Sequence, residues 1–184
     1  PGIEFYERYL RKYEGENEGR TIEAKYRMIT LLEKGRGSNT KINKLWDEIW
    51  EAYEASTPDS ISPILKRYAT LYQLRSFEET LAPLKTLKYV ENVSPATDEK
   101  NADVIKVALE LRDEISAYCV PLQEIGDLNA LMASYYCLAY TDNFIGRLLG
   151  DYPIPDFLPY EVQDIYIENL DQQKAPLLES GKTG

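Results

Sequence analysis

The sequence predicts an all-α fold, a single domain of six to eight helices arranged around a buried central helix, Leu128–Leu149. Three observations carry this prediction. Apolar residues recur at intervals of three and four along most of the chain, as they do on an amphipathic helix. No segment alternates apolar and polar residues in the manner of a half-buried strand. The segment 128–149 is apolar on nearly every side, which is typical of a helix enclosed by other helices.

Three helices are expected in the N-terminal third of the chain. The first spans Ile3–Glu14. The second begins at Thr21 and ends at Gly35, because glycine is the usual residue just past the end of a helix. The third covers about 40–55 and is the most clearly amphipathic, with acidic residues on its outer side. Its apolar stripe comprises Ile42, Leu45, Trp46, Ile49 and Tyr53.

Hydroxyl residues and prolines mark the next helix starts. Ser62 is expected to be an N-cap with Pro63 at the first helical position, so that a helix runs from there to about Arg75. The sequence Ser-Phe-Glu-Glu, which starts at Ser76, is a capping-box pattern and opens another helix. Pro83 lies inside that helix and predicts either a kink or a later start.

Two long helices are expected in the C-terminal half. Thr97 caps the first of them, and Pro121 should bend it or end it. Asp127 caps the second, which is the apolar central helix.

The remaining C-terminal segment is expected to contribute little to the core. A proline-rich stretch, 152–159, must be extended, and a short helix follows near Glu161–Leu170. The predicted domain therefore covers 1–171, and 172–184 form a frayed tail.

Composition restricts the functional classes. The chain has 184 residues and a formal net charge of −10, which disfavours indiscriminate binding to nucleic acids or anionic membranes. Its two cysteines, Cys119 and Cys137, lie within apolar helical patterns, so a reducing, cytoplasmic location is expected. No apolar run reaches the length of a membrane span, and the first residues do not form a signal peptide.

Histidine is absent from the sequence. Catalytic triads, histidine proton shuttles and most zinc or non-haem iron sites depend on this residue. The helical di-metal enzymes also combine their carboxylates with histidine, which this chain cannot supply. We therefore expect neither a metal nor a cofactor, and a protein that is not an enzyme.

Tyrosine is abundant, with 15 residues against four phenylalanines. A tyrosine can bury its ring and keep its hydroxyl in water, which suits helix edges and interfaces. The leading hypothesis is a non-enzymatic helical module for protein–protein interaction, such as an adaptor, an assembly subunit or an inhibitor, which could also self-associate. The expected contact residues are Trp50, Tyr53, Tyr6, Tyr9 and Tyr13.

The first alternative is binding of nucleic acid or phosphate by the basic segment Arg20–Lys44. The expected anion-binding residues are Arg20, Arg36, Lys41 and Lys44. Acidic residues that follow at Asp47 and beyond argue against a recognition helix, because phosphates would be repelled there.

The second alternative concerns Asp142, which projects from the middle of the apolar central helix. Tyr135, Tyr136 and Tyr140 could line a cavity around this acid, as in a small-ligand receptor or a histidine-free enzyme. Burial of a carboxylate is costly unless it is paired. The favoured interpretation is therefore structural, with Asp142 paired to a tyrosine, a cap or an arginine of another helix.

Overall fold

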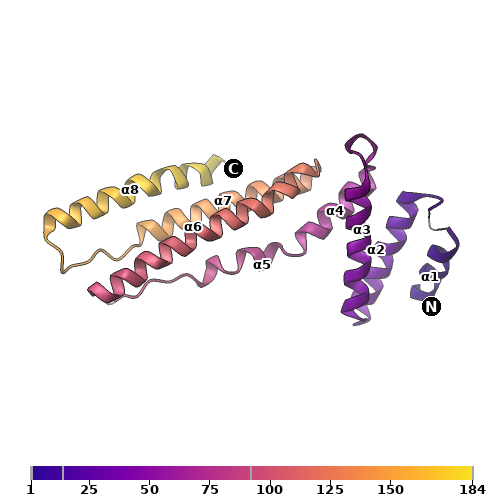
Figure 1. The fold of residues 1–184 in the computed structure, drawn as a ribbon, viewed down its shortest axis with the longest axis horizontal. Helices are drawn as coiled ribbons and strands as arrows, with labels where there is room; N and C mark the ends of the chain where they lie inside the picture. The colour runs from indigo at the N-terminus through magenta and orange to yellow at the C-terminus, as the bar shows by residue number, and fades with distance from the viewer. Residues whose placement is uncertain (1, 14, 92, 184) are drawn as a thin grey trace. The chain divides into compact units, whose positions relative to one another are not determined.

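The computed structural model describes residues 2–13, 15–91 and 93–183, and all regular elements in these ranges are helical (Figure 1). The all-α prediction is confirmed. Contacts between Cα atoms divide the chain into two compact units, where a single domain over 1–171 was expected. Unit 1 comprises Pro1–Arg75 and Ile125–Asn129, and unit 2 comprises Ser76–Glu124 and Ala130–Gly184. The two segments of each unit are separated in the sequence, because residues 125–129 group with the N-terminal helices.

Unit 1 contains four α-helices and the 3₁₀ turn Pro58–Ser60. Helix α2 contacts each of the other three and occupies the middle of the unit. The buried core lies between α2, α3 and α4, and α1 packs against it through half-buried apolar residues. The helices are α1 (Gly2–Tyr13), α2 (Glu18–Lys34), α3 (Asn39–Ala55) and α4 (Pro63–Leu74).

Two caps explain the helix starts in unit 1. Helix α2 begins at Glu18, three residues before the expected Thr21, because the Asn17 side chain accepts a hydrogen bond from the Arg20 amide at 2.9 Å. Helix α4 begins as expected, and the Ser62 hydroxyl accepts from the Leu65 amide at 3.2 Å.

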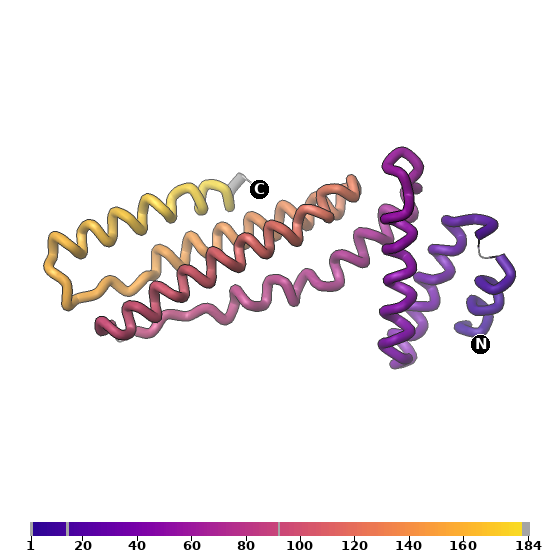
Figure 2. Tube along the Cα trace, in the orientation of Figure 1, coloured from indigo at the N-terminus to yellow at the C-terminus, as the bar shows by residue number. Residues whose placement is uncertain are grey.

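Unit 2 contains α5 (Phe77–Leu81), α6 (Pro95–Glu124), α7 (Leu128–Gly150) and α8 (Tyr160–Thr183), with a 3₁₀ turn at Leu84–Thr86. Helices α6 and α7 lie side by side, as the trace in Figure 2 shows, and their facing residues form one hydrophobic core together with residues of α5 and of the 3₁₀ turn. That core comprises Leu81, Leu84, Ala108, Ile115, Cys119, Cys137, Ile145, Leu148 and Leu149. Both cysteines are free thiols.

The start of α6 differs from the prediction. Ser94 and Thr97 cap it reciprocally, since the Ser94 amide donates to the Thr97 hydroxyl at 2.6 Å and the Thr97 amide donates to the Ser94 hydroxyl at 3.3 Å. The helix therefore begins at Pro95, and it continues through Pro121 to Glu124. The buried side chain of Asn101 also bonds both backbone groups of Val90, which holds the preceding loop against α6.

Helix α7 is enclosed along only part of its surface. Its buried residues concentrate towards the C-terminal half, where Thr141, Ile145 and Leu149 are almost fully covered. Leu128 is 70% exposed and Met132 is 62% exposed. The prediction of a helix buried on every side is therefore wrong for its N-terminal half.

The region expected to fray is helical. Helix α8 begins at Tyr160 and continues to Thr183, well beyond the expected end at Leu170. Leu177 packs against the core of unit 2, and a Cβ atom added at Gly146 of α7 would lie only 2.7 Å from the Leu178 side chain. This close packing against α7 accounts for the order of residues 172–183.

Candidate docking groove on the N-terminal helices

A groove of about 480 Å³ opens in unit 1 between α1, α2 and α4. It combines aromatic side chains from α1 with charged side chains from α2, and one aliphatic side chain comes from α4. The residues with large side chains along it are Phe5, Tyr6, Tyr9, Arg20, Glu23, Arg27 and Ile64.

The aromatic wall arises because α1 carries two apolar stripes. Ile3, Tyr6 and Leu10 follow one helical face and pack against the core. Phe5 and Tyr9, four residues apart, follow a neighbouring face that the core leaves uncovered. Phe5 is 57% exposed. Among the described residues, the only aromatic ring that it contacts is that of Tyr6, edge to face, at a centroid distance of 5.4 Å. Exposed apolar surface of this kind is typical of interaction sites.

Charged side chains of α2 line the groove, and one positive side chain has no ion-pair partner among the described residues. The Glu23 carboxylate accepts a hydrogen bond from Arg27 Nε at 2.7 Å and another from the Tyr68 hydroxyl. The bond from Tyr68, with help from Arg27, lowers the pKa of Glu23 below its ordinary value. Burial, together with Glu23, raises the pKa of Tyr68 to about 12. Arg27 and Glu23 thus compensate each other, whereas no ion pair reaches the exposed Arg20 guanidinium among the described residues.

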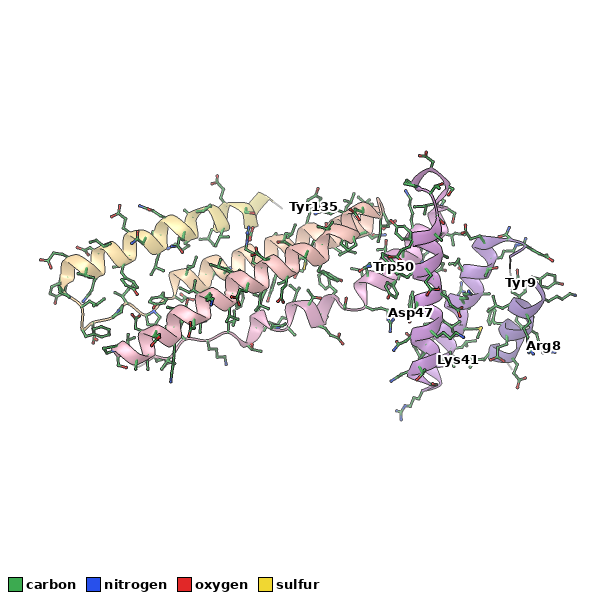
Figure 3. All side chains as sticks on the ribbon, in the orientation of Figure 1. Arg8, Tyr9, Lys41, Asp47, Trp50 and Tyr135 are labelled. Carbon is green, nitrogen blue, oxygen red and sulfur yellow. The ribbon has the colours of Figure 1, made fainter. Side chains whose placement is uncertain are left out.

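The expected contact residues separate into two groups. Tyr6 and Tyr9 line the groove, and Tyr13 contacts Tyr9 at a centroid distance of 5.2 Å. Trp50 and Tyr53 belong to α3 and do not line it. Figure 3 labels Tyr9 and Trp50 on their separate helices. Trp50 is half-buried and stacks on Tyr53 and on Tyr72, each at 5.1 Å, so its ring is engaged within unit 1.

The basic segment does not form one patch. Arg20 lies in the first turn of α2 and Arg36 lies two residues past its end, so about 21 Å of helix, from Arg20 to Lys34, separates them at 1.5 Å per residue. Lys41 forms an ion pair with Glu7, which lowers the pKa of that carboxyl, and Lys44 approaches Glu48 at 3.9 Å. The four expected anion-binding residues therefore do not converge on one ligand.

Asp142 is buried and forms an ion pair with the partly exposed Arg112. Its Oδ1 accepts from Arg112 Nε of α6 at 2.6 Å, and its Oδ2 accepts from the Ser180 hydroxyl of α8 at 2.6 Å. The carboxylate raises the pKa of Arg112 through the same hydrogen bond. One acid thus joins three helices of unit 2, which agrees with the structural interpretation.

The tyrosines expected around Asp142 do not enclose it. Tyr135 and Tyr136 are 51% and 58% exposed. Tyr136 and Tyr140 line a separate hollow of about 430 Å³, together with Phe144 and other residues of α7 and α8, and Asp142 is not among its lining residues. The hypothesis of a tyrosine-lined cavity around this acid is therefore not supported by the geometry.

Among the groove residues with large side chains, the sequence did not indicate four as parts of a site: Phe5, Glu23, Arg27 and Ile64. Phe5 and Tyr6 are adjacent in the sequence of the first helix, but they belong to two stripes that point in different directions. The offset between Ile3-Tyr6-Leu10 and Phe5-Tyr9 is the signal that could have separated a core-facing stripe from an exposed one.

The described residues give no support to a metal site or a membrane-spanning segment. Within the described ranges, no cluster of three or more cysteine, aspartate or glutamate residues could hold a metal ion. No helix in those ranges is both long and apolar enough to span a bilayer. Comparison with protein-family models, with curated proteins and with solved structures finds no match to this chain in any of the three.

Proposed function

We propose that this protein is a protein–protein interaction module, and that the groove on α1, α2 and α4 takes up an apolar segment of a partner that also carries carboxylates. One observation carries the proposal: the exposed ring of Phe5 lies in the same groove as the exposed guanidinium of Arg20. Aromatic residues and arginine are the types most enriched among energetically dominant interface residues.

The alternatives have less support. An enzyme needs a nucleophile or a general acid–base pair in a site, and the acid that was the best candidate, Asp142, is occupied by Arg112 and Ser180. A nucleic-acid surface needs a converging set of cations. Lys41 and the buried Lys25 are instead matched to carboxylates of the same unit, with Lys25 at 2.9 Å from Glu48.

Site-specific photocrosslinking tests the proposal. A photoreactive phenylalanine analogue replaces Phe5 in the full-length protein, which is then irradiated in an extract of its source cells. Phe157 of unit 2, which is 44% exposed, is the matched control position. We expect a defined protein adduct at position 5 and not at 157, and Arg20→Glu should reduce it about tenfold.

Three outcomes would contradict the proposal. One is equal labelling at positions 5 and 157, which would indicate non-specific contact. Another is an adduct that contains only nucleic acid or only a small molecule. The third is an adduct whose yield does not change in the Arg20→Glu background.

A further inference from the structure

The exposed face of α8 has the composition that the groove requires of its partner. Ile165 is 57% exposed, which is unusual for an isoleucine in a helix that packs on a core. Glu161 lies four residues before it and Glu168 three residues after it, so the helical period places all three on one face.

The opposite face of α8 is the one attached to unit 2. Leu170 packs against the core, and the Tyr166 hydroxyl donates to Asp98 at 3.4 Å. The face around Ile165 therefore points away from the rest of its unit, and it presents an apolar anchor between carboxylates.

The charges of the two surfaces are complementary. Of the chain's 21 basic and 31 acidic residues, 13 of each lie in unit 1, which leaves 8 basic and 18 acidic residues in unit 2. Among the described residues, Glu161, Asp164 and Glu168 of α8 form no ion pair. The ion pair that this helix does contain joins Lys174 and Asp171. The groove of unit 1, in contrast, has the cation Arg20, for which the described part of the chain supplies no ion-pair partner.

We propose that the occupant of the groove is helix α8 of a second copy of this chain. This inference rests on the proposed function, and it names the partner. The contact is of the helix-in-groove type: Ile165 inserts beside Phe5 and Tyr9, and Arg20 binds the carboxylates of Glu161 and Glu168. Because each copy carries one groove and one α8, the contact is heterologous, and it generates a ring or an open chain of copies.

Sedimentation velocity of the full chain tests the inference at concentrations from about 1 to 200 µM, the range in which micromolar affinities are resolved. The wild type should associate as its concentration rises, and added salt should weaken the association. Arg20→Glu removes the groove cation and Ile165→Asp removes the helix anchor, and each should weaken self-association at least about tenfold.

Mixing the two variants gives the decisive result. The Arg20→Glu protein keeps an intact α8 and the Ile165→Asp protein keeps an intact groove, so a mixture should form a one-to-one pair that neither forms alone. Arg36→Glu and Val107→Asp, which change an exposed arginine and an exposed valine elsewhere, should associate like the wild type. Far-UV circular dichroism checks that every variant is folded.

The inference is overturned if the wild type stays monomeric over this range, or if the mixture forms no pair. The photocrosslink at position 5 then distinguishes failure of the self-association from failure of the proposed protein-binding function. An adduct with a different protein preserves the proposed function and removes the second copy as partner, whereas an absent adduct removes both.

Discussion

The Asp142→Ala substitution should destabilise unit 2 by about 2–3 kcal/mol, because it leaves two polar groups without their acceptor. Loss of one partner from an enclosed ion pair costs about 3–5 kcal/mol. The Arg112 side chain is 39% exposed, so water recovers part of its solvation and the contribution falls to about 2 kcal/mol. The Ser180 hydroxyl loses its bond to Oδ2, which adds about 0.5–1 kcal/mol.

Urea unfolding measures this effect. Far-UV circular dichroism follows the helices of both units, whereas the two tryptophans, Trp46 and Trp50, both lie in α3 and report unit 1. Asp103→Ala, at an exposed acid on α6, should change stability by less than about 0.5 kcal/mol and serves as the control. In a double-mutant cycle with Arg112→Ala, the two losses should fall short of additivity by at least about 1 kcal/mol.

A change below about 0.5 kcal/mol in Asp142→Ala, with no coupling to Arg112, would refute this reasoning. It would show that the ion pair does not hold the three helices together. A ligand-binding role for the acid would then have to be considered again.

Three further substitutions test other contacts. Gly146→Ala should destabilise the protein by about 1–3 kcal/mol in thermal unfolding, because its Cβ would lie 2.7 Å from Leu178, whereas Gly150→Ala should be tolerated. Asn101→Ala should cost about 1–2 kcal/mol in urea unfolding, since it frees both backbone groups that hold the loop before α6, and a smaller loss would show that water replaces the side chain. The pKa of Glu23 is lowered in the folded state, so its contribution is complete above about pH 4.3, the ordinary glutamate pKa, and is lost as the pH falls through the folded value. Glu23→Gln should therefore flatten the decline of the urea midpoint below that pH, and an unchanged slope would contradict the assignment.

Local sequence signals predicted where a helix begins when a capping residue determines that position. The Ser62-Pro63 pair gave the start of α4, and Asp127 preceded α7 as expected, with its Oδ1 accepting from the Asn129 amide at 2.9 Å. For α6 the predicted cap was Thr97 alone, whereas Ser94, which also precedes a proline, caps the helix together with Thr97. A reciprocal cap of this kind is readable from sequence.

Tertiary contacts determine the features of the fold that local sequence signals did not predict. Residues 172–183 contain a proline and polar side chains that predict fraying, yet they are helical because Leu178 and Ser180 contact α7. The division into two units was also hidden, since the connection 125–129 groups with the N-terminal helices. For Asp142, the sequence favoured a structural pairing with a tyrosine, a cap or an arginine of another helix, and the choice of Arg112 among these depends on how α6 lies along α7.

The uneven distribution of charge changes how the net charge of −10 should be interpreted. The excess of acid belongs to unit 2, while unit 1 has equal numbers of acidic and basic residues. Electrostatic interactions between exposed groups fade over about 8–10 Å at physiological ionic strength, so a docking partner responds to the groups nearest to it. At the groove of unit 1, Arg20 is the charged group that forms no ion pair with any described residue. A globally acidic chain can therefore bind an acidic segment, and a copy of its own α8 meets that requirement without any other component.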